Sequence, residues 1–149
     1  MSEAALRKAL ADSIVETLDA MFFTSCIGDP DPEGAPPGMA AQVPFEGSRP
    51  GRLTVRMTAR AARSIAANFL GEDEDAVSDR QIGDVLCELA NMICGFVLSR
   101  VEGAAELRLG APRIVEPGVP PAAAIVHAVE TGCGVLEAAL EMEGRVCPP

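Results

Sequence analysis

The chain has 149 residues, 48% of them hydrophobic, so we expect one domain over residues 1–149 that buries its own core. Acidic residues (22) outnumber basic ones (12), the formal net charge is −10, and the basic residues form no cluster. This balance argues against a nucleic-acid partner and against an anionic membrane surface. We also expect no membrane-spanning segment, and the N-terminus lacks the features of a signal peptide, so the expected location is the cytoplasm.

Cysteine and histidine usage restricts the possible chemistry. The five cysteines are odd in number and have no CxxC spacing: Cys26, Cys87, Cys94, Cys133 and Cys147. We therefore expect neither a disulfide framework nor a zinc site. His127 is the only histidine and lies in a strand-like segment, so a structural role is the favoured interpretation and a multi-histidine metal centre is excluded. Carboxylates, amides or a partner must supply any chemistry.

The first third of the chain predicts a helix, a loop and a hairpin. Residues 3–22 place apolar side chains at steps of four, which is typical of a helix. Residues 28–38 are too rich in proline and glycine for a regular element. Residues 40–46 and 52–57 follow, the second with strict apolar and polar alternation, and we expect two strands joined by a turn.

Two further helices have recognisable ends. Thr58 can cap the second helix, and Gly71 can close it. After the acidic linker 72–75, Ser78 and Gln81 form a capping-box pair, and the apolar-periodic run that follows predicts a third helix ending near Gly103.

The remainder predicts strands at 106–109, 123–129 and 135–142, with residues 131–134 as the turn of a final hairpin. The composition of 135–142 favours a helix whereas its alternation favours a strand, and its position after a glycine-containing turn decides for the strand. The fold class is therefore α+β, with long helices packed on a mostly antiparallel sheet.

The third helix has two distinct faces. Apolar residues occupy an arc of about 120°, which we interpret as the core face: Ile82, Val85, Leu86, Leu89, Ile93, Phe96 and Val97. Four other residues fall in an arc of about 60° on roughly the opposite side: Asp84, Glu88, Asn91 and Gly95. They form one solvent-facing polar stripe.

This polar stripe permits two interpretations on the residues alone. A mid-helix glycine costs roughly 1 kcal/mol relative to alanine, so Gly95 indicates a close contact there. If this close contact is made with a partner protein, the helix presents two carboxylates and an amide beside the contact. Alternatively, the polar residues form an ordinary solvated face and Gly95 packs against another element of the chain.

The spacing Asp84-x-x-x-Glu88-x-x-Asn91 resembles the signature of the CheC/CheX/FliY family of chemotaxis phosphatases. The similarity extends over the strand, helix, acidic linker and motif helix from about Arg52 to Gly103, and more loosely over the first helix and the final hairpin. It implies a CheC-like domain that dephosphorylates a phosphorylated response regulator.

The resemblance also implies roles for individual residues. Glu88 would pair with the active-site lysine of a CheY-type regulator, and Asn91 would enter the regulator's pocket and hold a water in line with phosphorus. Asp84 and Gly95 would contribute to partner binding. This chain would need no cofactor of its own, because the regulator supplies Mg²⁺. The role of Asn91 is physically adequate, since phosphoryl transfer depends mainly on positioning and charge stabilisation.

Some family members have the signature twice, and the first helix contains Asp12-x-x-x-Glu16-x-x-Asp19. Here a carboxylate replaces the amide, and an ionised carboxylate cannot donate a hydrogen bond and repels a phosphoryl group. We expect one active helix, as in single-site CheX-like proteins, and attribute the match in the first helix to chance.

Two alternatives remain open at this point. The domain could bind a response regulator without hydrolysing its phosphoryl group, or it could be an assembly component that forms a homodimer through an exposed sheet edge.

Overall fold

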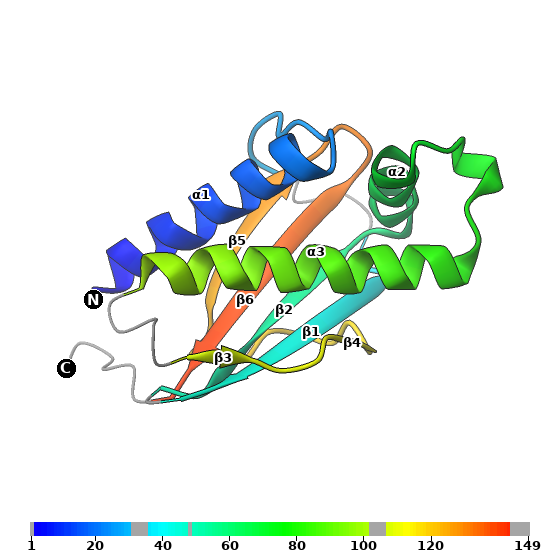
Figure 1. The fold of residues 1–149 in the computed structure, drawn as a ribbon. Helices are drawn as coiled ribbons and strands as arrows, with labels where there is room; N and C mark the ends of the chain where they lie inside the picture. The colour runs from blue at the N-terminus through cyan, green and yellow to red at the C-terminus, as the bar shows by residue number, and fades with distance from the viewer. Residues whose placement is uncertain (1, 31–35, 48, 102–106, 144–149) are drawn as a thin grey trace.

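The computed structural model describes residues 2–30, 36–47, 49–101 and 107–143 (Figure 1). Its helices and strands confirm the α+β prediction, including the strand assignment of residues 135–142. Gly103, where the third helix was expected to end, lies outside the described residues, as do residue 106 and Cys147. In chain order the elements are α1 (Glu3–Met21), β1 (Met39–Glu46), β2 (Gly51–Met57), α2 (Ala59–Leu70), a short 3-10 helix (Glu74–Ala76), α3 (Asp79–Arg100), β3 (Arg108–Leu109), β4 (Arg113–Val115), β5 (Ile125–Glu130) and β6 (Val135–Met142).

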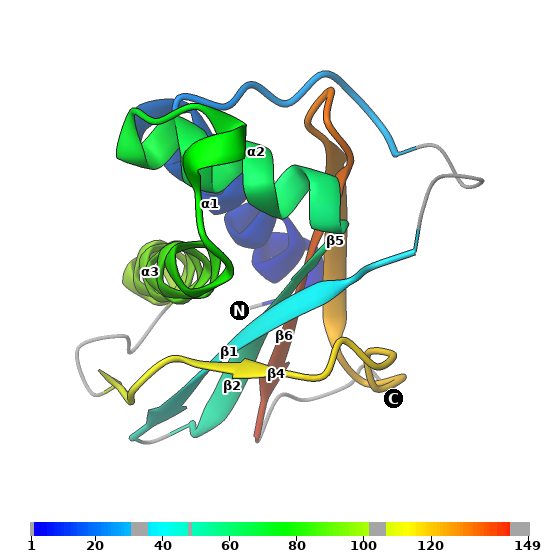
Figure 2. The same ribbon diagram turned by 90° about the vertical axis from the view of Figure 1, so that its right-hand side faces the viewer.

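The strands form one antiparallel sheet in the order β3-β1-β2-β6-β5, and β4 also pairs with β1. Strands β3 and β4 therefore share the outer edge of β1, with β3 opposite Phe45 and Glu46 and β4 opposite residues 40–42. Figure 2 shows that the helices lie on one side of the sheet. Helix α3 lies between α1 and the sheet edge formed by β3 and β4. One flank of α3 faces α1, and the other flank faces β3 and β4.

The predicted helix ends are confirmed by their hydrogen bonds. The Thr58 hydroxyl accepts a hydrogen bond from the Ala61 amide, and Gly71 ends α2 in the left-handed conformation at φ 67°. Ser78 and Gln81 form both hydrogen bonds of a capping box at the start of α3. Helix α3 contains the polar stripe, which we now call the α3 stripe: Asp84, Glu88, Asn91 and Gly95. Strong local signals thus fix its position along the chain.

The core face of α3 differs from the prediction in one residue. Phe96 is 41% exposed, and its ring lies 5.9 Å from the Arg100 guanidinium instead of packing in the interior. Helix α3 contacts both α1 and the sheet, so its buried arc extends toward Ala90, Cys94 and Leu98 and leaves Phe96 outside. The other six predicted core positions are buried.

Helix α3 is relevant to the prediction that the chain has no membrane-spanning segment. It has 22 residues, and its apolar stretch reaches a mean hydropathy of 1.6, so by length and composition it could cross a bilayer. This finding alone does not contradict the expectation of no membrane-spanning segment, because the core helix of a protein meets the same test. Half of that stretch is buried inside the protein, which is typical of a core helix, and a single helix of this kind is weak support for a membrane span.

The sheet contains two ion pairs between β2 and β6 that differ in burial. Arg56 lies opposite Glu137, with Nη1 and Oε1 3.5 Å apart, and its side chain is only 8% exposed. Its Nε also donates to the Pro117 carbonyl. Arg52 lies opposite Glu141 at 2.8 Å, but its side chain is 50% exposed.

This difference predicts unequal losses of stability. Glu137→Ala should lower the free energy of unfolding by about 2–3 kcal/mol, because it leaves the buried Arg56 charge without its partner. Glu141→Ala removes an exposed pair and should cost less than about 1 kcal/mol. Urea unfolding of both variants checks the prediction, and equal losses would contradict it.

Candidate functional site on helix α3

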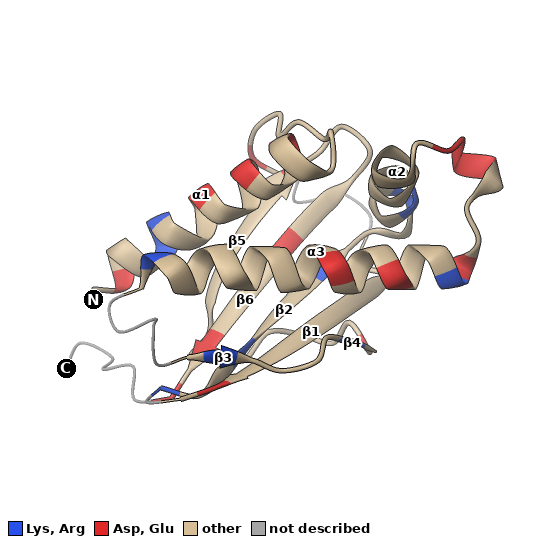
Figure 3. Ribbon diagram, in the orientation of Figure 1, with Lys and Arg blue, Asp and Glu red and all other residues tan. Residues whose placement is uncertain are grey.

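The α3 stripe lies on the solvent side of the helix. Asp84 and Glu88 are exposed, and Asn91 and Gly95 are half-buried. Figure 3 shows acidic positions on successive turns of α3. Within residues 2–30, 36–47, 49–101 and 107–143, no hydrogen bond or ion pair joins the side chain of Glu88 or Asn91 to another residue. Both groups can therefore bind another molecule.

The short strands β3 and β4 border one side of the α3 stripe. A Cβ atom built on Gly95 would lie 3.8 Å from Leu109 Cδ1, and one built on Gly83 would lie 3.7 Å from Ile114 Cγ1. Asn91 comes between these two glycines, both along the helix and around its axis. The half-burial of Asn91 is consistent with this position beside the sheet edge.

Both distances at the glycines are ordinary van der Waals contacts, so the fold has room for a methyl group at Gly95. Gly95 thus lies against another element of the chain, Leu109 of β3, but this contact does not require a glycine. Its lack of a side chain leaves a gap in the α3 stripe beside Asn91.

The cysteines of α3 are not activated nucleophiles. Burial and the nearby negative charge of Asp84 raise the pKa of Cys87, and burial raises the pKa of Cys94 to about 12. Both thiols are thus protonated near neutral pH. His127 lies on β5, at the opposite edge of the sheet from β3, and is not brought to the α3 stripe.

The described part of the chain contains no group of three or more histidine, cysteine, aspartate or glutamate side chains placed to hold a metal ion. That a metal or cofactor is not required stays a prediction. The functional groups of the α3 stripe are one carboxylate pair and one amide.

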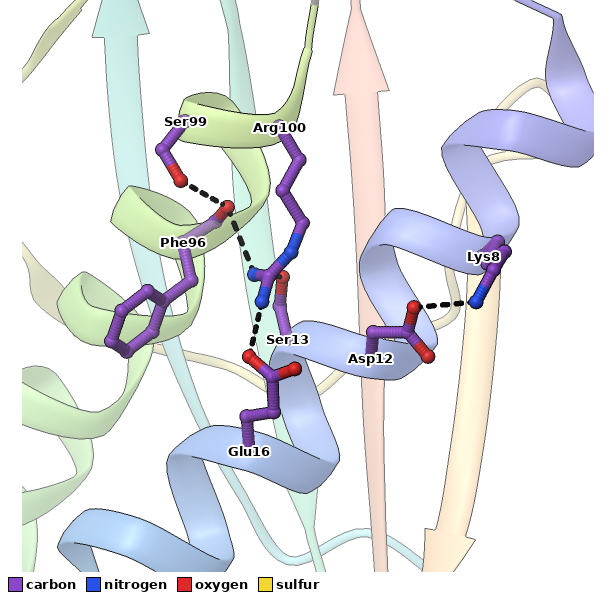
Figure 4. A network of polar contacts seen from close by, with 7 residues as sticks. All are labelled: Lys8, Asp12, Ser13, Glu16, Phe96, Ser99 and Arg100. Atoms are coloured by element: carbon purple, nitrogen blue, oxygen red, sulfur yellow. Dashed lines mark hydrogen bonds and ion pairs between the residues drawn. The ribbon is translucent and has the colours of Figure 1, made fainter.

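The similar spacing on α1 has a different environment (Figure 4). Glu16 accepts a hydrogen bond from Arg100 of α3, and the same guanidinium donates to the buried Ser13 hydroxyl at 2.7 Å. Asp12 pairs with Lys8 at 2.8 Å, and this hydrogen bond lowers the pKa of the Asp12 carboxyl. Two of the α1 carboxylates are thus bound to cations of their own chain, whereas Glu88 is free to pair with a partner's cation.

Two hollows in the described surface lie away from the α3 stripe. One, about 570 Å³, is at the end of the sheet near Phe45, Arg52 and Met142. Another, about 440 Å³, is at the start of α2 near Thr58 and Cys133. Glu88 and Asn91 line neither of them, but project from a helix. Such groups suit a substrate that brings its own pocket, which is the property of a macromolecule and not of a small molecule.

The fold and the α3 stripe together define an α+β domain that presents a carboxylate and an amide from the solvent side of a helix. A family model described as "Chemotaxis phosphatase CheX" matches residues 39–120, more than half of the chain. The chain belongs to this family, which confirms the resemblance found in the sequence. A comparison with curated proteins gives no match.

Solved structures of chemotaxis proteins have the same fold. CheX from Vibrio vulnificus has a TM-score of 0.76 at 16% identity, covering 96% of this chain and 99% of that one. CheX from Desulfovibrio desulfuricans has a TM-score of 0.74 at 18% identity, covering 93% and 99%. CheX from Borrelia burgdorferi, solved as a complex with CheY, BeF3 and Mg, has a TM-score of 0.74 at 17% identity, covering 91% and 96%.

Proposed function

We propose that this protein hydrolyses the phosphoaspartate of a CheY-type response regulator in the cytoplasm. The family supports a phosphatase, and the Borrelia burgdorferi structure, in which a CheX protein is bound to CheY with BeF3 and Mg, supports a receiver domain as the partner. The observation that carries the proposal is the pair of the exposed Glu88 and the half-buried Asn91, whose side chains have no partner among the described residues.

Glu88 acts in docking. Its carboxylate is exposed and lies about one helical turn from Asn91, so a lysine beside the phosphoryl group can pair with it while the amide enters the pocket. Such a pair fixes the orientation of the two proteins and adds to affinity when it is desolvated in the complex. Asp84 and the gap at Gly95 belong to the same contact surface.

Asn91 positions the attacking water. Its amide oxygen accepts a hydrogen bond from the water and directs the water oxygen at phosphorus. A bond forms between the water oxygen and phosphorus while the bond between phosphorus and the aspartyl oxygen breaks. The products are inorganic phosphate, which retains both protons of the water, and the regulator's free aspartate carboxylate. The regulator supplies Mg²⁺, which offsets negative charge on the phosphoryl group. This chain provides only the position of the water and the charge of Glu88.

The proposal is tested with purified receiver domains from the same organism. Each is phosphorylated with a small-molecule phosphodonor, and phosphate release is followed with and without this protein at matched concentrations. At least one domain should lose phosphate faster when the protein is present. No acceleration with any domain would refute the proposed activity.

Gly95→Ala should separate folding from function. The variant should be more stable by up to about 1 kcal/mol, since alanine favours the helix interior and the methyl group meets only an ordinary contact with Leu109. Phosphate release at low regulator concentration should nevertheless fall several-fold, because the methyl group fills the gap beside Asn91.

Gly83→Ala is the matched control, since it adds the same methyl group to the same helix at an equally ordinary distance from Ile114. It should increase stability to a similar degree with a smaller loss of phosphate release. Equal activity of Gly95→Ala and the parent would remove Gly95 from the contact surface.

A homodimer also stays a prediction. Measurement of the mass in solution decides it, independently of activity.

A further inference from the structure

Two large apolar side chains remain in solvent beside the α3 stripe. Leu109 of β3 is 39% exposed, and Ile114 of β4 is 47% exposed. Leu107, two residues before Leu109, packs against the core. Leu109 and Ile114 thus leave apolar surface at this edge of the sheet.

Both side chains face α3. Leu109 lies beside Gly95 and Ile114 beside Gly83, which places them at two points along the flank of the helix that contains Asn91. The residues that precede Leu109 and Ile114 in the chain, Arg108 and Arg113, are charged. Successive side chains of a strand point to opposite faces, so the two arginines point away from the face of Leu109 and Ile114. Arg113 accordingly donates to Gln42 of β1 at 3.3 Å.

The surface around Asn91 therefore has a polar centre and an apolar border on the side of the sheet. We name Leu109 and Ile114 the β3–β4 rim. A protein pocket that receives Asn91 must come close to the β3–β4 rim, because Leu109 lies beside Gly95 of the α3 stripe and Ile114 lies beside Gly83 of the same helix. Apolar contacts around a polar pair exclude water and increase its contribution to binding. Exclusion of bulk water also suits a reaction that uses one positioned water.

We infer that the β3–β4 rim binds the phosphorylated receiver domain and determines how strongly this protein recognises its substrate. The inference rests on the proposed function, and it assigns the β3–β4 rim to the receiver domain because it is continuous with the surface of Glu88 and Asn91. Leu109 and Ile114 touch the partner around its phosphorylated pocket and not the reacting atoms. They act on affinity and leave the chemical step unchanged.

The test uses Leu109→Gln and Ile114→Thr, singly and together. Glutamine keeps the length of leucine, and threonine keeps the β-branch that a strand favours, so both variants are expected to fold. Phosphate release is measured against receiver-domain concentration. Each substitution should raise KM several-fold and the pair about tenfold or more, while kcat stays within about twofold of the parent.

Val119→Thr is the matched control. Val119 is 85% exposed and lies between β4 and β5, outside the β3–β4 rim, so its substitution should leave KM unchanged. Thermal unfolding of every variant separates loss of contact from loss of fold.

Failure of the proposed function and failure of the inference about the β3–β4 rim give different experimental results. If the parent releases no phosphate, the proposed function is wrong. If the parent is active and Asn91→Ala is not, but the double variant keeps the parental KM, the inference about the β3–β4 rim is wrong and the function stands. A change of the double variant from dimer to monomer with an unchanged KM would assign the β3–β4 rim to a second copy of this chain, and would also overturn the inference.

Discussion

Asn91→Ala is expected to lower kcat for phosphate release by at least about 100-fold while the affinity for the receiver domain changes little. Removal of one preorganised hydrogen-bonding group at a reacting centre typically costs this much. The fold should be unaffected, because the Asn91 side chain makes no hydrogen bond to a described residue and is only half-buried. Measurement of phosphate release at saturating receiver domain gives kcat, and titration with a beryllofluoride-activated domain gives the affinity.

Two variants control this result. Asn68→Ala removes an amide from α2 whose hydrogen bond goes to Thr24 at 3.2 Å, and it should retain parental kcat. Asn91→Asp keeps the shape of the side chain but brings negative charge toward the phosphoryl group, so it should be as inactive as the alanine variant. An Asn91→Ala protein with parental kcat would show that the water is positioned by another group.

Glu88→Lys is expected to weaken binding to the receiver domain by about 100-fold or more, because it replaces an attractive charge pair by a repulsive one in a desolvated contact. Glu88 is exposed in the free protein and lacks an ion-pair partner among the described residues, so its replacement should not reduce stability. Isothermal titration with the beryllofluoride-activated domain measures the effect.

Asp75→Lys controls for overall charge. Asp75 is exposed in the short 3-10 helix before α3, and its substitution changes the net charge by the same amount as Glu88→Lys. It should alter affinity by less than about threefold at physiological salt. Equal losses in the two variants would mean that the net charge, and not a specific pair at Glu88, governs association.

Local signals explain why much of the fold could be predicted from the sequence. The caps at Thr58, Gly71 and Ser78 each satisfy backbone groups within a few residues, so their effect is independent of the rest of the molecule. Alternation in residues 52–57 identified a strand for the same reason. Segment 135–142 was ambiguous in composition, and the pairing of β6 with both β2 and β5 explains why it is a strand.

The errors arise where distant parts of the chain meet. Phe96 belongs to the apolar pattern of α3, but the packing of α1 on that helix decides which positions are buried. Strand β4 has only three residues, too few to show alternation, and exists because the edge of β1 is available for pairing.

The residues of the candidate site could be predicted from the sequence, but the residues that surround them could not. Its four residues lie on one helix face, which the spacing alone determines. Its surroundings come from residues far away in sequence: Leu109 and Ile114 beside the α3 stripe, and Arg100 bound to Glu16 of α1. The roles of Glu88 and Asn91, and the organisation of residues 1–149 as one domain, stay predictions.

The central claim is that this protein hydrolyses the aspartyl phosphate instead of only binding the regulator. The most direct measurement is a single-turnover time course, in which a phosphorylated receiver domain is mixed with excess protein and complex formation and free phosphate are recorded together. We expect phosphate to appear at least tenfold faster than from the receiver domain alone, at a rate that saturates as the protein concentration rises. Saturating complex formation with phosphate release no faster than from the receiver domain alone would contradict the claim and identify a non-catalytic binding module.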